Sequence, residues 1–416
     1  MDHGHLGGVG VRHDHPGQRR GARPDGEHGP TGGATASCGS PCPEGGDPAH
    51  DLRHHGDVDA APGQLDFAVN VQGEAPPAWL RARLATTLDD LARYPSAARD
   101  ERARAAVADR HGRRRDEVLV LAGSAEGFAL LPALRPRLAA VVHPGFTEPE
   151  LALRTGDVPV VRVLTAEADG HRLDPAAVPD EADLVVIGNP TNPTGVLHPA
   201  TALRELARPG RVLLVDEAFA DALPGEPGSL AGAADVPGLL VFRSLTKTWA
   251  LAGLRAGYAL GAPELLARLA RPRPHWPVST IALEAVTACC SPAAVAEGAA
   301  AATRLQRWRA AQAAALAAVP GVTVLPGVAP FLLLRLPPGS GSPVRAALQG
   351  AGIAVRRGET FPGLGPDHVR VAVRAPEQVA VLAAALGAAL DRRERRSAGS
   401  EGLSISAVSF STGEAR

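Results

Sequence analysis

The chain nearly lacks lysine. Lys247 is the only lysine among 416 residues, although lysine and arginine together number 43. Arginine stays charged at any ordinary pH, so only Lys247 offers an amine that can become neutral and form a Schiff base with a carbonyl. A surface lysine retained by chance and a nucleophilic lysine both fit this observation, and the motifs around it must decide between them.

The composition gives no support for membrane or nucleic-acid partners. The formal net charge is -1, and the chain has no apolar run of about 18 residues, the length that spans a bilayer. The first residues also lack the apolar segment of a secretory signal. We therefore expect no nucleic-acid partner, no membrane partner and a cytoplasmic location.

Cysteine is too scarce for a disulfide scaffold. The four cysteines are Cys38, Cys42 and the adjacent Cys289 and Cys290, a spacing that matches no paired zinc motif. We expect reduced, inert thiols and no metal site. Residues 1–48 are rich in Gly, Pro and His. A metal-binding tail is one interpretation of this segment, and a disordered leader, which the composition favours, is the other.

Apolar strands alternate with amphipathic helices over most of the chain. Continuous apolar runs, such as DEVLVLAG at 116–123 and RVLLVDEAF at 211–219, predict a parallel sheet that is buried on both faces. From about residue 291 a long Ala-rich helix leads into shorter strands and helices. The expected fold class is α/β, with a mostly parallel central sheet in a large domain and a smaller α+β domain.

The expected boundaries follow these changes in pattern. A leader at 1–48 and a disordered tail at 392–416 flank the folded part. Within it we expect an N-terminal arm at 49–75, a large cofactor-binding domain at 76–290 and a small C-terminal domain at 291–391.

Polar residues gather where the predicted strands end, which is where open parallel sheets bind ligands. Asn192 and Asp216 follow two such strands, and Ser244 ends a third, three residues before Lys247. A further strand leads into GSAEG, where Ser124 opens a helix whose free N–H groups can hold a phosphate. Each feature alone could be a helix cap or a turn. Together they supply a phosphate cradle, an acid, a hydrogen-bond donor and an amine, which suits pyridoxal phosphate.

The motifs NPTNPTG, DEAF and SLTKTWALAGLRAGY occur in this order and resemble those of fold type I pyridoxal-phosphate enzymes of the aminotransferase class I/II group. The resemblance covers residues 54–390. It implies that Lys247 forms the Schiff base with the cofactor, that Asp216 pairs with the protonated ring nitrogen and that Asn192 donates to the ring O3′. The other implied cofactor contacts are Ser124, Ala125, Ser244 and Arg255 at the phosphate, Phe146 on the ring face and Phe219 beside O3′.

The same resemblance suggests a partner subunit and a substrate. The segment ARYPS resembles the one whose tyrosine reaches the cofactor phosphate of the neighbouring subunit, so Tyr94 implies a homodimer with shared sites; a buried structural tyrosine is the alternative. Arg370, in HVRVAVR, resembles the arginine that binds a substrate carboxylate as a bidentate fork. Arg356, in IAVRRG, lies where a phosphate-reading arginine is expected, and Asn70 is the third candidate for substrate binding.

Two reactions within the group remain open. The stretches LDFAVNV and FPGLGPDHVRVAVR, with Phe219 where many aminotransferases carry tyrosine, resemble threonine-phosphate decarboxylases of cobalamin biosynthesis, whereas VNVQGEAPP departs from their N-terminal turn. We expect a decarboxylase of this type that acts on a phosphorylated small-molecule amino acid or amine. An aminotransferase of the histidinol-phosphate type is the alternative, and a non-catalytic binding module of the same fold is the second.

Overall fold

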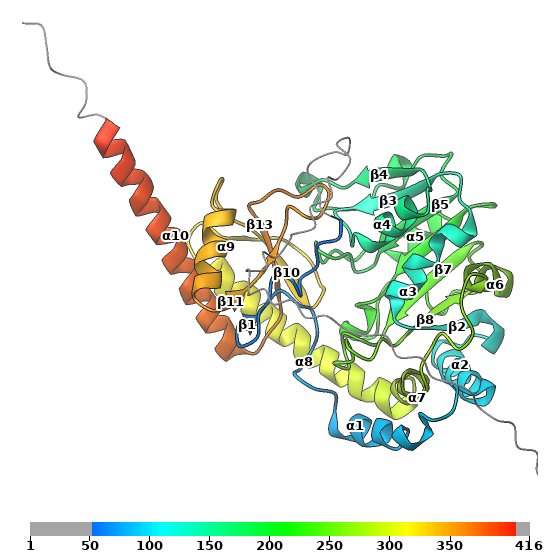
Figure 1. Ribbon diagram of the computed structural model, residues 1–416. Helices are drawn as coiled ribbons and strands as arrows, with labels where there is room; N and C mark the ends of the chain where they lie inside the picture. Colours follow the sequence, from blue (N-terminus) through cyan, green and yellow to red (C-terminus); the bar gives the residue numbers. More distant parts are fainter. Residues whose placement is uncertain (1–51, 405–416) are drawn as a thin grey trace, which may run out of the picture. The chain divides into compact units, whose positions relative to one another are not determined.

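The computed structural model describes residues 52–404, and Figure 1 shows their arrangement. The leader expected at 1–48 and residues 405–416 of the expected tail therefore lie outside the described residues. The described residues belong to one compact unit, which contains every element described below.

A seven-stranded sheet in the order β2-β8-β7-β6-β5-β3-β4 forms the centre of the larger part. All of its strands are parallel except β8, which is antiparallel to both of its neighbours. The strands are β2 (Val118–Leu121), β3 (Ala139–His143), β4 (Val160–Leu164), β5 (Leu184–Gly188), β6 (Val212–Asp216), β7 (Leu239–Ser244) and β8 (Gly257–Gly261).

Helices cover both faces of this sheet. Successive residues of a strand point to opposite faces, so each strand contributes to two hydrophobic cores. In β5, Val185 belongs to the core under α2 and α7, whereas Leu184 belongs to the core under α3, α4 and α6. The helices of this part are α1 (Ala78–Ala85), α2 (Ala97–His111), α3 (Ser124–Ala129), α4 (Glu148–Thr155), α5 (Ala200–Glu205), α6 (Pro263–Ala270) and α7 (Thr280–Cys289). Single-turn 3-10 helices lie at Leu88–Asp90, Arg115–Glu117, Leu131–Leu134, Glu167–Asp169, Pro175–Ala177 and Ala220–Ala222.

The long helix α8 (Pro292–Ala317) leads into a smaller α+β part with an antiparallel sheet in the order β12-β13-β10-β9. The strands are β9 (Thr323–Val324), β10 (Phe331–Arg335), β12 (Arg356–Arg357) and β13 (His368–Ala372), and the helices are α9 (Gly341–Gly350) and α10 (Pro376–Ser404). Strand β1 (Leu65–Asp66) of the arm pairs in parallel with β11 (Ile353–Ala354). The arm is thus bound to the smaller part, and Phe67 is buried in its core.

The mostly parallel sheet and the smaller α+β part confirm the expected fold class, whereas the boundaries at 75, 290 and 391 stay predictions. The last helix differs from the expectation, because α10 continues to Ser404 beyond the predicted start of an irregular tail at 392. The stretch DRRERR at 391–396 consists mainly of good helix formers, and no proline interrupts it.

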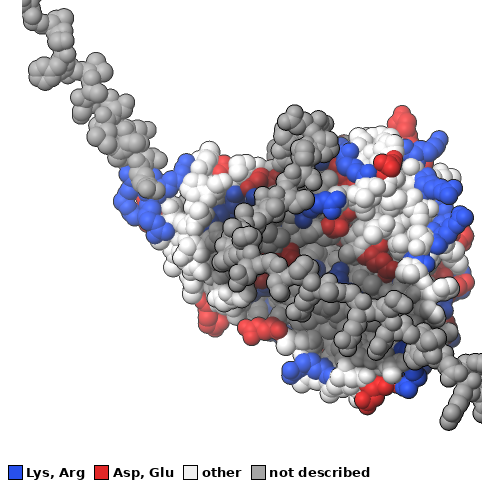
Figure 2. Space-filling view, viewed as in Figure 1, with Lys and Arg blue, Asp and Glu red and all other residues white. Residues whose placement is uncertain are grey.

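No single helix among residues 52–404 is long and apolar enough to cross a membrane; α7 and α8 meet that test only as a pair that is bent by 72°. Positive and negative side chains are interspersed over the described part of the face in Figure 2. On this face, a charged ligand is therefore attracted by individual charged side chains and not by a large area of one charge sign.

Candidate active site

A cavity of about 510 Å³ opens where the large sheet faces the arm and the smaller sheet. All of the predicted site residues line it except Tyr94: Asn70, Ser124, Ala125, Phe146, Asn192, Asp216, Phe219, Ser244, Lys247, Arg255, Arg356 and Arg370. Residues up to 300 positions apart in the sequence therefore meet in one place.

The carboxyl ends of β5, β6 and β7 form the floor of the cavity. These strands are adjacent and parallel, so their last residues meet at one edge of the sheet. Asp216 ends β6, and the N–H of Ala218 donates to its Oδ1 at 3.2 Å. Lys247 follows β7, and its carbonyl accepts a hydrogen bond from the N–H of Gln72 at 2.8 Å, which ties the lysine loop to the arm.

Burial shifts the pKa values of Asp216 and Lys247 in opposite directions. It raises the pKa of Asp216 to about 7, although the Ala218 N–H and the charge of Lys247 oppose this. It lowers the pKa of Lys247 to about 8, and the charges of Arg370 and Arg255 lower it further. A cation placed against the Asp216 carboxylate favours its ionised form. A protonated pyridine nitrogen is such a cation, so these residues fit the cofactor that the sequence predicts.

Glycines open a cradle beside α3. A Cβ at Gly257 would lie 2.7 Å from the carbonyl oxygen of Arg243 and 3.1 Å from the backbone nitrogen of Ser124, so any side chain there would push the first turn of α3 away. Gly123, with φ of 78°, would carry a Cβ only 3.0 Å from Nη2 of Arg255. The backbone N–H groups of a first helical turn have no partner within their helix. Together with the guanidinium of Arg255 they fit a phosphate.

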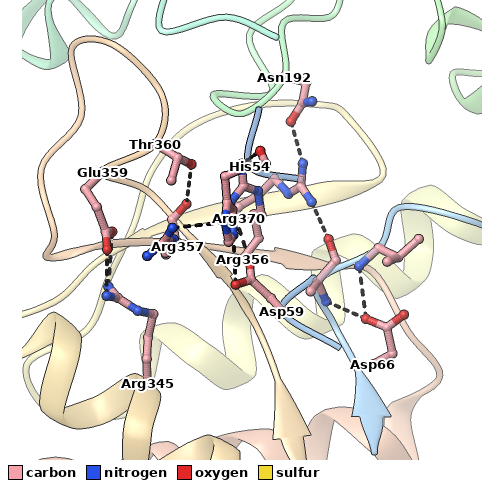
Figure 3. A network of polar contacts seen from close by, with 12 residues as sticks. His54, Asp59, Asp66, Asn192, Arg345, Arg356, Arg357, Glu359, Thr360 and Arg370 are labelled. Carbon is pink, nitrogen blue, oxygen red and sulfur yellow. Dashed lines mark hydrogen bonds and ion pairs between the residues drawn. The ribbon is translucent and has the colours of Figure 1, made fainter. Parts of the chain in front are cut away.

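A hydrogen bond joins the two parts of the chain across the cavity. Nη1 of Arg370, on β13, donates to Oδ1 of Asn192 at 2.6 Å, and its Nη2 donates to the carbonyl of Ala68 (Figure 3). The guanidinium lies over the ring of Phe331, 5.4 Å from its centre. Because the carbonyl oxygen of Asn192 is occupied in this way, its amide nitrogen is the atom left to donate to a ligand.

Arg356 lies beside Arg370 as its register partner on β12. It packs 4.7 Å from the ring centre of Phe361, and its Nη2 donates to the carbonyl of His54 at 2.8 Å. Burial lowers the pKa of Arg370 to about 9, and the charge of Arg356 contributes to this. Two guanidinium groups that face the same cavity from adjacent strands favour a ligand with anionic groups.

Aromatic side chains and one amide complete the walls. The ring of Phe146, after β3, lies 5.9 Å from that of Phe128, and Phe219 meets Phe331 edge to face at 5.1 Å. Asn70 is 3% exposed, and among the described residues neither atom of its amide group has a hydrogen-bond partner. A buried amide without hydrogen-bond partners lowers the stability of the fold. Asn70 is therefore a candidate for a hydrogen bond to a ligand.

Tyr94 lies elsewhere. Its side chain is 74% exposed and stacks on Trp276 with ring centres 4.2 Å apart, outside the lining of the cavity. Within one chain it is therefore not the buried structural tyrosine of the alternative interpretation.

Three ionisable residues of the cavity lining were not predicted from the sequence, namely His55, Asp57 and Glu148. Glu148 stands two positions after Phe146 in HPGFTEP, so it could have been found from that motif. His55 and Asp57 belong to the arm, where His55 closes a His-rich stretch that was interpreted by composition alone.

Comparisons with known proteins agree with this geometry. The profile of the family described as aminotransferase class I and II matches residues 62–386. The chain belongs to this family. A histidinol-phosphate aminotransferase of Mycobacterium tuberculosis (strain ATCC 25618 / H37Rv) is 56% identical over 332 residues, which are 80% of this chain and 89% of the relative.

Two further similarities are more distant. A threonine-phosphate decarboxylase of Salmonella typhimurium is 33% identical over 335 residues, or 77% of this chain and 90% of the relative. The structure of a histidinol-phosphate aminotransferase from Sinorhizobium meliloti in complex with pyridoxal 5′-phosphate covers 79% of this chain and 90% of its own, with a TM-score of 0.69 and 22% identity. This aminotransferase-family enzyme uses pyridoxal phosphate as its cofactor.

Proposed function

We propose that this chain is an aminotransferase that acts on histidinol phosphate, with 2-oxoglutarate as the amino-group acceptor. The observation that carries the proposal is the pair Arg356 and Arg370, whose guanidinium groups reach the lysine cavity from adjacent strands. One substrate brings a phosphate and the other brings two carboxylates, and both kinds of anion suit arginine forks. The 56% identity to a histidinol-phosphate aminotransferase supports this reaction. The decarboxylase ranked first by the sequence analysis has the weaker support, at 33%.

We assign the cofactor contacts to the floor of the cavity. Asp216 holds a proton on the ring nitrogen, Asn192 donates to the ring O3′, and Phe146 covers one ring face. Phe219 lies beside O3′ without donating to it. The phosphate lies in the cradle formed by Ser124, Ala125, Ser244 and Arg255.

Lys247 is the catalytic residue of the proposal. Pyridoxal phosphate supplies an aldehyde and an electron-withdrawing ring. Because burial and neighbouring arginines lower the pKa of Lys247 to about 8, a useful fraction of its amine is neutral near neutral pH. The neutral amine would hold the cofactor through its aldehyde. Once the substrate's amine has displaced it there, the freed amine would accept and return the proton at the substrate carbon that bears the amino group. Arg370 and Asn70 orient that carbon by holding the substrate's anionic group.

The proposal includes a homodimer. Tyr94 and Trp276 form an exposed aromatic pair, and exposed aromatic side chains are favourable at protein interfaces. We assign Tyr94 to the cofactor phosphate of a second copy, since it does not line the cavity of its own chain. A dimer in sedimentation that dissociates, or loses cofactor affinity, in Tyr94→Ala is the expected result.

Threonine-phosphate decarboxylation is the second candidate, and Phe219 favours it. This side chain lies at the cavity, packed on Phe331, and carries no hydroxyl for the ring O3′. Such a lyase would belong to cobalamin biosynthesis, as the sequence resemblance implies.

One experiment separates the candidates. The purified protein loaded with pyridoxal phosphate is incubated with histidinol phosphate plus 2-oxoglutarate and, separately, with threonine phosphate alone. Glutamate in the first mixture and no carbon dioxide in the second is the expected result. Carbon dioxide release without glutamate would replace the proposal with the second candidate, and neither product would overturn both.

A further inference from the structure

The proposed function assigns no role to three ionisable residues that line the cavity, namely His55, Asp57 and Glu148. Nε2 of His55 and Oε1 of Glu148 are 2.5 Å apart. Asp57 also lines the cavity, and its charge is one of the influences that oppose the effect of burial on the pKa of Lys247. The cavity therefore has acidic groups outside the assigned cofactor contacts, in addition to its three arginines.

His55 and Glu148 lie beside Phe146. The ring of His55 lies beside it, with centres 5.7 Å apart, and Glu148 opens helix α4 two residues later. His55 and Glu148 are partly exposed, with side-chain exposures of 35% and 27%. A carboxylate has more acceptor sites than one histidine contact uses, so Glu148 can accept a second hydrogen bond from a ligand.

Gly56 lets the arm lie close to the cavity wall. A Cβ at this position would lie 2.6 Å from the carbonyl oxygen of Ala68, so a side chain there would force the arm outward. Ala68 also accepts from Arg370 and precedes Asn70, the buried amide without partners. The arm, the substrate arginine and the unpartnered amide therefore meet on one wall.

Further contacts anchor the arm in this position. Nη2 of Arg357 donates to Nδ1 of His54 at 2.9 Å, which leaves Nε2 of His54 to donate to Asp59 at 3.0 Å (Figure 3). Asp59 in turn pairs with Arg356 at 3.4 Å. At the other end of the segment, the hydroxyl of Thr147 donates to the carbonyl of Leu52 at 2.9 Å. The segment is thus anchored at Leu52, His54 and Asp59, on both sides of His55 and Asp57.

From this arrangement we infer that His55, Asp57 and Glu148 form a specificity site for a nitrogen-bearing side group of the substrate, such as an imidazole. This inference rests on the proposed function, which places the anionic groups of the substrates at Arg356 and Arg370. The rest of the substrate shares the cavity with two carboxylates and a histidine, which favour a cation or an N–H donor over a hydrocarbon. A site built to hydrogen-bond a ring N–H rejects a ring without one, because its own polar groups are then left unpaired.

Two substrates that differ only in this ring test the inference. Histidinol phosphate carries the imidazole, and phenylalaninol phosphate carries a phenyl ring in the same place. The readouts are kcat/KM with 2-oxoglutarate and, independently of turnover, the Kd from calorimetry of the protein loaded with pyridoxamine phosphate, which has no aldehyde to react with an amine substrate. The variants are Asp57→Asn and Glu148→Gln, which keep the shape of each side chain. Glu205→Gln, on the exposed surface of α5, is the matched control.

The wild type should prefer the imidazole, and each variant should lower the ratio of the two kcat/KM values about 10-fold or more, as expected for hydrogen bonds to charged groups. The Kd ratio should move in the same direction, and the control should change neither. Equal losses on both substrates, or no change in either ratio, would overturn the inference. A wild type that binds with this preference but forms no glutamate would contradict the proposed function and leave the specificity site standing. The absorbance band of the bound cofactor shows that each variant is folded.

Discussion

The two walls of the cavity are built in different ways. The wall to which we assign the cofactor, here called the cofactor wall, belongs to strand ends and adjoining turns of one sheet. Its residues are Ser124, Ala125, Asp216, Ser244, Lys247 and Arg255. The substrate wall, formed by His55, Asp57, Asn70, Arg356 and Arg370, comes from the arm and from two strands of the smaller sheet. Hydrogen bonds that cross the chain hold the second wall together, such as the one from Arg370 to Asn192.

This difference separates two kinds of function. Chemistry that depends on the cofactor needs groups fixed to a rigid frame, and parallel strands fix them through a continuous ladder of hydrogen bonds. Substrate choice depends on side chains from segments that are remote in sequence. Those segments can change without disturbing the sheet. Variants of the cofactor wall should therefore alter the spectrum and kcat, whereas variants of the substrate wall should alter KM and selectivity.

The largest effect is expected for Lys247→Arg on the cofactor wall. Arginine keeps the charge but offers no neutral amine, so turnover should fall by about 10⁴-fold or more while the fold is retained. Borohydride reduction and peptide mapping of the wild type should place the pyridoxyl group on Lys247. As a control, Arg304→Lys in the Lys247→Arg background puts an amine on the exposed surface of α8. Activity restored by that amine would contradict the assignment.

Asp216→Ala should have the next largest effect. The ring nitrogen loses the carboxylate that keeps it protonated, and kcat should fall roughly 10²- to 10³-fold, as for other lost electrostatic contacts in a buried site. The affinity for pyridoxal phosphate, measured by absorbance titration, should also fall. Asp109→Ala, on the exposed face of α2, is the matched control. If the rate and the cofactor affinity of Asp216→Ala equal those of the control, the carboxylate does not face the ring.

Arg356→Gln tests the substrate wall. Loss of a charged hydrogen-bond donor should raise KM for histidinol phosphate about 10- to 100-fold, with little change in the absorbance of the bound cofactor. Steady-state kinetics and a spectrum of the same sample measure both. A changed spectrum with an unchanged KM would assign Arg356 to the cofactor wall and abolish the distinction between the two walls.

The positions of most residues of the cofactor wall could be predicted from the sequence, because they follow apolar strand runs directly. Asp216, Ser244 and Lys247 stand within or just after such runs. The parallel pairing of the strands brings these positions together and does not depend on the conformation of the loops. The same runs predicted the central sheet. The continuation of α10 to Ser404 was not predicted, since charged residues give no apolar periodicity although they form helices well.

The substrate wall could be predicted only where the family resemblance supplied a motif. Arg356 and Arg370 were found in that way, but nothing in the sequence shows that they are register partners. His55 and Asp57 were missed because their place depends on Gly56, whose close approach to Ala68 is a contact of the folded chain. Among 14 histidines, eight of which occur by position 55, composition alone could not single out one.

A buried histidine supports the loop of Asn192 and makes the stability of the fold depend on pH. His198 accepts from the N–H of Leu173 and lies 3.1 Å from the hydroxyl of Thr191, and its backbone N–H donates to Asn189 at 2.8 Å. Burial lowers the pKa of His198 from 6.5 to about 4. His198 therefore binds a proton less readily in the folded chain than in the unfolded chain. The contribution of neutral, buried His198 to the stability of the fold is complete above pH 6.5 and is lost as the pH falls towards 4.

Between pH 7 and pH 5 this histidine alone should lower the free energy of unfolding by about 2 kcal/mol. Urea titrations at both pH values measure the change. His198→Gln should be less stable than the wild type at pH 7 but should lose less on acidification. His275→Gln, on the exposed surface, serves as the control and should follow the wild type. Parallel pH dependence in His198→Gln and wild type would contradict the role of His198.

The smallest effect is expected for Phe219→Tyr, at the border of the two walls. The new hydroxyl can donate to the ring O3′ and so favour its deprotonated form, which lowers the pKa of the visible absorbance band of the bound cofactor. One hydrogen bond contributes about 1 kcal/mol, so the decrease should be up to about one pKa unit. The arginines hold the substrate carbon, and they are unchanged, so the ratio of glutamate to carbon dioxide formed should stay the same. A pH titration of the band beside both product assays measures this. A band that does not move would mean that Phe219 faces away from the cofactor, and a switch in product would mean that the cofactor wall selects the reaction as well as supporting it.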